Sequence, residues 1–148
     1  MNIENKYSKL LKMLSIAAIL LTTTGLAANY NDLAAKGYRW VTVDGPYACR
    51  SKDDLRRITE HHTDEAELRM VGELRAFYLI EGAIIQVLQE DATSGMSRIR
   101  TAEIKPNVWT LTKFLSRRPI RNTYGVIETP EALGPIPTKI TGDYGIVP

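Results

Sequence analysis

Short apolar or alternating stretches, separated by turn residues, fill the middle of the chain and predict a β-rich unit. Residues 96–104 (MSRIRTAEI) alternate polar and apolar side chains, as a half-buried strand does. Runs of apolar, aromatic and β-branched residues predict further strands at 38–43, 77–80, 83–88 and 108–111. Several short strands at this spacing are typical of a small barrel or sandwich.

Two short helices are predicted after the first of these strands. Ser51 precedes a lysine and two aspartates, which is typical of a helix start, because serine caps free N–H groups and carboxylates favour the positive end of the helix dipole. This helix is expected to run to about Glu60, and a second is expected to begin at Thr63. Residues 112–116 predict a single helical or 3₁₀ turn.

The first 27 residues have the pattern of a secretory signal peptide. Three lysines precede an apolar run at 13–21, and small residues follow it at the expected cleavage site. The run is too short to span a bilayer comfortably, which favours a cleaved signal peptide. An uncleaved N-terminal anchor is the alternative interpretation. We therefore expect a bacterial protein exported to the periplasm or secreted, with membrane contact only through the leader if it is uncleaved.

Removing the leader changes the charge balance of the chain. The whole sequence has 19 basic and 17 acidic residues, and the leader accounts for three lysines and one glutamate. The mature chain is therefore formally neutral, and no overall positive field remains to attract nucleic acid. A nucleic-acid partner is not expected.

Composition divides the mature chain into a globular part and a tail. Residues 28–116 are expected to form a single domain, with a helical lead-in at 50–74 and a β-barrel core at 75–116. Residues 117–148 hold five of the seven prolines and are expected to form an extended tail. The helical part and the tail are additions that we expect to pack on the β unit or cover its open edges.

The β-rich unit resembles the bacterial Src-homology-3-type (SH3b-like) barrel of exported proteins. The resemblance covers about residues 75–116 and is carried by YLIEGAIIQVLQED, GMSRIR and VWTLTKFL. In that family a glycine precedes a strand of the form xVxVL, a second glycine precedes a strand with a basic residue near its end, and an aromatic-containing strand leads into a 3₁₀ turn. The matching positions are Gly82, Ile85, Val87, Leu88, Gly95, Ile99, Arg100, Trp109 and Leu115.

The resemblance implies a mainly β fold: a small SH3-like barrel preceded by two short helices and followed by an irregular tail containing proline and glycine. It also implies a non-catalytic module that binds a protein partner or a cell-envelope component such as a wall peptide or glycan. Exposed aromatic residues in a groove would suit such a role. The candidate binding residues are Tyr78, Arg100, Trp109 and Tyr124. For Trp109 the alternative is an anchor of the core, and for Arg100 a solvated, salt-bridging surface.

One stretch has metal-ligand chemistry, and we expect it not to bind a metal. Residues 61–67 (HHTDEAE) contain imidazole and carboxylate groups, but adjacent histidines point about 100 degrees apart on a helix, whereas ligands need separations of three or four residues. A polar connector between the two helices is the favoured interpretation, and no cofactor is predicted.

Cys49 is the only cysteine, so no intramolecular disulfide can form. We expect its side chain to be buried, because free cysteine packs as a small hydrophobe. A hydrolase that pairs Cys49 with His61 or His62 is one alternative function, but the larger papain-like core of such peptidases is missing. A second alternative is an accessory subunit of an envelope-spanning assembly whose tail becomes ordered on binding. No catalytic residue is predicted.

Overall fold

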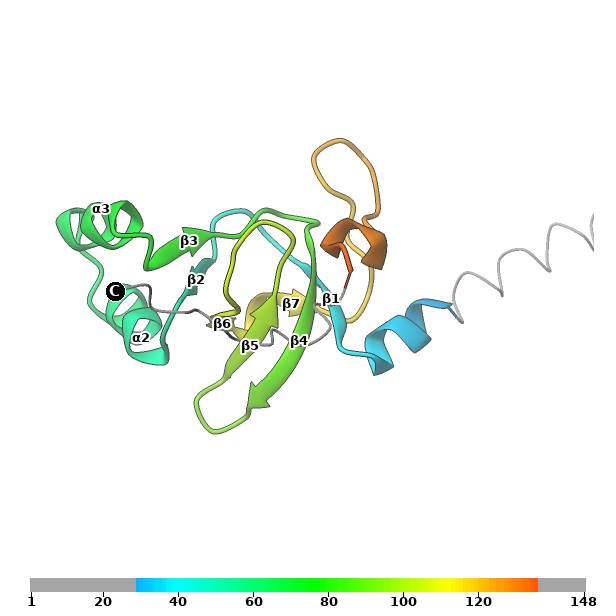
Figure 1. Cartoon of the computed structure of the whole chain (residues 1–148), viewed down its shortest axis with the longest axis horizontal. Coiled ribbons are helices and arrows are strands. Elements are labelled where there is room, and N and C mark those ends of the chain that lie inside the picture. Colours follow the sequence, from blue (N-terminus) through cyan, green and yellow to red (C-terminus); the bar gives the residue numbers. More distant parts are fainter. Residues whose placement is uncertain (1–28, 136–148) are drawn as a thin grey trace, which may run out of the picture.

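A computed structural model describes residues 29–135, and within this range seven strands form one antiparallel sheet (Figure 1). The strands are β1 (Tyr38–Val41), β2 (Tyr47–Cys49), β3 (Ala76–Tyr78), β4 (Ile84–Asp91), β5 (Met96–Arg100), β6 (Val108–Leu111) and β7 (Leu115–Ser116). The helices are α2 (Lys52–Glu60) and α3 (Asp64–Gly72), with 3₁₀ turns η1 (Thr112–Phe114) and η2 (Pro130–Leu133), and residues 29–35 are also helical. The predicted leader and residues 136–148 lie outside the described residues.

The sheet is bent but not closed, which corrects the expectation of a barrel. Its strand order is β3-β2-β6-β5-β4-β1-β7, and every neighbouring pair is antiparallel. Within residues 29–135, β3 and β7 end this order and do not pair with each other. The result is a mixed α/β fold whose sheet has two edges.

The sequence analysis expected the two helices to precede the β unit, and this expectation is wrong. They form at the predicted positions, with the Ser51 side chain accepting a hydrogen bond from the Asp54 N–H at 3.1 Å and Thr63 capping α3 in the same way. However, β1 and β2 come before them in the chain and belong to the same sheet. The helices are therefore an insertion between β2 and β3.

The predicted strand ends differ from the observed ones for local reasons. β5 ends at Arg100, four residues early, because Thr101 turns the chain by accepting a hydrogen bond from the Ile104 N–H at 2.9 Å. β2 was not predicted, since three residues beside Pro46 are too few to show an alternating pattern. β6 has the predicted bounds, and a 3₁₀ turn follows it as expected.

Three apolar clusters hold the structure together. The interior cluster lies inside the bend of the sheet and is made of Val41, Ala48, Leu79, Ile85, Ile99 and Val108. The helix-side cluster joins the sheet to α2 and α3 through Cys49, Leu55, Ile58, Met70, Ala76 and Met96. The C-terminal cluster contains Tyr38, Trp40, Ile84 and Leu133. Figure 1 shows the helices α2 and α3 at one end of the sheet and η2 near β1 and β4.

Residues 117–135, here called the C-terminal segment, pack on the sheet, as additions of this kind were expected to do. The Trp40 indole N–H donates to the carbonyl oxygen of Glu128 at 3.0 Å, and the Glu128 carboxylate accepts the Ile84 N–H at 3.0 Å. Gly82 has a φ of +78°, and a Cβ there would lie 2.5 Å from the backbone of Asn122. The segment can therefore approach this closely only because residue 82 is glycine. No helix among the described residues is long and apolar enough to cross a membrane.

Candidate functional site

An apolar groove of about 690 Å³ opens beside β3. Four short segments line most of it: β3 itself, residues 79–81 that follow it, the turn at 101–104, and residues 122–124 of the C-terminal segment. We call it the seam groove, because it lies beside β3, one of the two edges of the open sheet.

The floor of the seam groove is the interior of the bent sheet. Leu79 and Ile85 line the groove and belong to the interior cluster, while Phe77, Ala83 and Ile104 line it and pack against that cluster. Leu79 and Ile85 are buried at this floor, whereas Phe77, Ala83 and Ile104 are only half-buried. The apolar surface that is open to a ligand is therefore that of the half-buried and rim side chains.

Large apolar side chains also stand exposed at the rim of the groove. Leu74, Tyr78, Ile80 and Tyr124 are 59%, 47%, 57% and 88% exposed, and all four line the groove. Apolar side chains gathered around an apolar hollow are typical of an interaction site. Leu74 and Ile80 were not among the predicted site residues, because a continuous apolar run such as residues 77–80 does not reveal which members are exposed.

The open edge of β3 adds hydrogen-bonding groups to this site. On the β2 side, the Leu79 N–H donates to the carbonyl of Pro46 at 2.8 Å, and the Arg50 N–H donates to the carbonyl of Arg75 at 3.0 Å. Antiparallel pairs alternate, so the backbone groups of Ala76 and Tyr78 point away from β2. Ala76 is buried, whereas Tyr78 is 47% exposed, so of the two residues Tyr78 is the one that offers these groups at the surface.

The structure brings two of the four predicted site residues together. Tyr78 and Tyr124 both line the seam groove. Arg100 does not form the solvated surface considered as its alternative: it is buried, and its guanidinium donates to the carbonyls of Leu133 and Gly134 at 3.2 and 3.4 Å. Trp109 is half-buried against the helix-side cluster, with the Lys52 ammonium 4.4 Å from its ring centre. Neither Arg100 nor Trp109 lines the groove.

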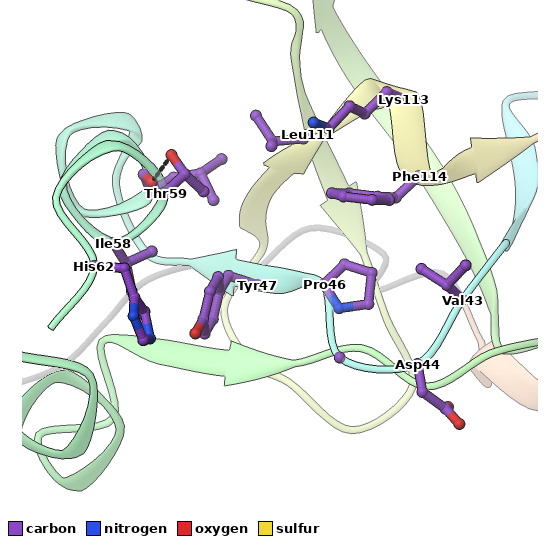
Figure 2. Close-up of a pocket in the computed structure, with 12 residues that line it drawn as sticks. Val43, Asp44, Pro46, Tyr47, Ile58, Thr59, His62, Leu111, Lys113 and Phe114 are labelled. Atoms are coloured by element: carbon purple, nitrogen blue, oxygen red, sulfur yellow. Dashed lines mark hydrogen bonds between the residues drawn. The ribbon is translucent and has the colours of Figure 1, made fainter. Parts of the chain in front are cut away.

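A second, smaller pocket of about 370 Å³ lies between α2, β2 and η1 (Figure 2). Pro46, Tyr47 and Phe114 give it aromatic and apolar walls, and Figure 2 shows Asp44 and Lys113 at opposite ends. The Thr59 hydroxyl on its wall donates to a carbonyl of its own helix at 2.7 Å. This hydroxyl already has its partner, and Val43, 45% exposed, is the one exposed large apolar side chain among the described residues that line the pocket.

The structure brings His62, Asp64 and Glu67 closer together than the helix-face argument implied. Their ligand atoms lie within 4.8 Å of one another, because His62 precedes α3 and is not bound to the spacing of a helix. The His62 Nε2 and a Glu67 carboxylate oxygen are 2.5 Å apart, and the Tyr78 hydroxyl donates to the other oxygen. The Tyr78 hydrogen bond is the main reason that the pKa of Glu67 lies below its usual range, and His62 adds to it. A hydrogen-bonded cluster at the start of α3 accounts for this proximity.

Cys49 is fully buried, as predicted. Desolvation raises the pKa of its thiol to about 12, and the nearby Asp54 carboxylate adds to the shift. The thiolate is the nucleophilic form of cysteine, so a buried thiol with a raised pKa is a poor nucleophile. The hydrolase alternative thus lacks the accessible thiolate that it requires.

No model of a known protein family, no curated protein and no solved structure matches this chain.

Proposed function

We propose that this chain is an exported, non-catalytic binding module that takes an extended segment of a partner protein into the seam groove. The observation that carries the proposal is the seam groove itself, where Leu74, Ile80 and Tyr124 are exposed at the rim of a floor that continues into the interior cluster. Apolar side chains of a partner would bury there, and each fully buried aliphatic side chain contributes about 1.5–3 kcal/mol.

Addition of a strand to β3 is the binding mode that fits this surface. An extended segment next to β3 would pair with the outward backbone groups of the exposed Tyr78. Alternate side chains of such a segment would point into the groove, since side chains in a strand alternate between faces. Main-chain pairing would supply affinity, and the apolar floor would select the side chains.

An SH3-type barrel, left open at one seam, is the fold that we propose for the bent sheet. Support comes from β1, which pairs with both β4 and β7, and from η1, which stands directly before β7. The proposed cellular place is the periplasm or the exterior, on the basis of the leader sequence.

A proline substitution at Tyr78 tests the binding mode. The Tyr78 N–H points away from β2, so Tyr78→Pro leaves the β2–β3 ladder intact while removing the donor offered to a partner. Tyr78→Ala is the matched control, because it removes the same side chain and keeps the N–H. The probe is a phage-displayed library of linear random peptides, selected on the mature chain and then measured as synthetic peptides.

We expect selected peptides to bind Tyr78→Pro about tenfold more weakly than Tyr78→Ala, which corresponds to about 1.4 kcal/mol. Circular dichroism and thermal unfolding check that both variants fold. Equal affinities in two folded variants would contradict strand addition. Failure of the wild-type chain to select any peptide would contradict the proposed function.

A further inference from the structure

The ionisable side chains that line the seam groove all carry one sign of charge. They are Glu81, Glu103 and Glu128, and no lysine, arginine or histidine is among the described residues lining it. Glu128 already accepts the Ile84 N–H. Glu81 and Glu103 make no ion pair within residues 29–135. Two uncompensated carboxylates thus lie at an otherwise apolar groove.

The two carboxylates come from different elements of the fold. Glu81 lies on the link from β3 to β4 and is half-buried, whereas Glu103 lies on the turn between β5 and β6 and is exposed. Both stand next to the segments that a strand added to β3 would pass. A cation on such a strand would meet both carboxylates at the groove.

Two arginines that lie beside β3 in the structure, Arg75 and Arg50, already have partners. Arg75 donates to the carboxylates of Asp54 and Glu73. Arg50 donates to the carbonyl of Leu74, and its guanidinium carbon lies 5.8 Å from the centre of the Phe77 ring. Arg75 is thus compensated by two carboxylates, whereas the Arg50 guanidinium lies beside Leu74 and Phe77, two residues of the groove, without lining it itself. The charged side chains that line the groove are therefore glutamates.

We infer that the partner segment is an extended peptide that carries both apolar residues and lysine or arginine. The inference rests on the proposed function and adds the charge of the partner to it. The apolar floor calls for apolar side chains, and Glu81 and Glu103, which line the same groove, call for cations beside them on the same face of the peptide. A segment carrying acidic residues at the same places would be repelled.

Three synthetic peptides of one length test this charge preference. Each repeats a valine–isoleucine pair followed by two identical residues, which are lysine, glutamine or glutamate, so that each face of the extended peptide carries both kinds of side chain. Their affinities for the mature wild-type chain are measured by fluorescence anisotropy at low and high salt. We expect the lysine peptide to bind about tenfold more tightly than the glutamate peptide at low salt. The difference should shrink at high salt, because salt screens exposed charges.

A charge-matched pair of variants assigns the effect to the groove. Glu81→Gln/Glu103→Gln should bind the lysine and glutamate peptides about equally. Glu60→Gln/Glu90→Gln removes the same net charge from exposed positions outside the groove, and should keep the wild-type preference. The glutamine peptide should bind all three proteins alike, which also shows that they are folded.

The outcomes separate the inference from the function on which it rests. Equal binding of the three peptides to the wild-type chain would overturn the charge preference and leave the proposed function standing. Binding of none of them would count against both. Concentration-dependent dimerisation in sedimentation experiments, abolished by Ile80→Asp, would assign the groove to a second copy of this chain and overturn the inference.

Discussion

The outer faces of the sheet and its open seam differ in whether other elements of the chain cover their apolar side chains. On one outer face, α2 and α3 cover Cys49 and Met96, and on another the C-terminal segment covers Trp40. At the seam groove, Ile80 and Tyr124 stand exposed at the rim, while Leu79 and Ile85 lie buried at the floor. The difference indicates that the covered faces provide stability and that the seam is available for binding.

The covered faces and the seam also differ in the hydrogen bonds that their polar groups make. On the covered side, the buried Arg100 and the Trp40 indole both donate to carbonyls of the C-terminal segment. At the seam, the outward backbone groups of Ala76 and Tyr78 face away from their sheet partner. The buried hydrogen bonds hold the C-terminal segment on the sheet, whereas the backbone groups of an unpaired strand edge can pair with another chain.

The largest expected effect comes from removing a side chain beneath a cover. Trp109→Ala should lower the free energy of unfolding by about 3 kcal/mol, because Trp109 packs on the helix-side cluster and under the Lys52 ammonium. Urea unfolding measures the change, and Trp109→Phe is the milder control. Peptide affinity of the folded variant should not change, since Trp109 does not line the seam groove. Lost affinity at unchanged stability would instead make Trp109 a binding residue.

A smaller loss is expected where the C-terminal segment is fastened. Arg100→Met should cost about 2 kcal/mol, because it leaves the carbonyls of Leu133 and Gly134 without their donor. Arg98→Met, on the exposed side of the same strand, is the control and should change stability little. Limited proteolysis should cut the C-terminal segment faster in Arg100→Met. Equal cutting rates in both variants would show that Arg100 does not hold the segment.

Substitutions at the rim of the seam groove should lower peptide affinity and leave stability unchanged. Ile80→Ser/Tyr124→Ser removes two exposed apolar side chains from the rim, so peptide affinity should fall about tenfold while the melting temperature stays unchanged. The comparison requires an exposed apolar control away from the groove. Leu68→Ser on α3 serves, because Leu68 is exposed and does not line the groove. A marked drop in melting temperature in the rim variant would mean that the seam also contributes to stability.

The sequence could predict local elements better than their closure. Capping residues such as Ser51 and Thr63 act within one helical turn, so both helices were placed correctly. The strand β6 also has its predicted bounds. Whether the sheet closes depends on the positions of β3 and β7, which lie far apart in the chain, and no local pattern encodes that pairing.

The residues of the candidate site could also be predicted only in part from local sequence patterns. Tyr78 and Tyr124 were chosen as aromatic residues, and both line the groove. Trp109 was chosen by the same signal and does not line it, and Arg100, chosen as a basic residue, is buried. The side chains of Leu74 and Ile80 were missed, because an apolar residue is read as part of the core unless its exposure is known. Burial is set by tertiary contacts. Residue type could therefore suggest candidate site residues, but it could not tell which of them are exposed.

The smallest expected effect at neutral pH concerns Cys49 beneath the helices. Its pKa is raised from 9.0 to about 12 by burial, so from about pH 9 upward the unfolded chain releases the thiol proton while the folded protein keeps it. The folded state binds more protons in this window, and its stability must therefore fall as the pH rises from 9 towards 12. At neutral pH both states hold the proton, and the titration contributes nothing.

Cys49→Ala should remove this part of the pH dependence. The free energy of unfolding, measured by urea titration from pH 7 to above pH 9, should fall less steeply in the variant than in the wild-type chain. Tyr47, whose pKa is also raised to about 12 by burial, is present in both proteins, so its contribution cancels in the difference. Parallel curves would mean that Cys49 ionises as readily in the folded protein as in the unfolded one. Water would then reach beneath α2, and the helix-covered face would be as open as the seam.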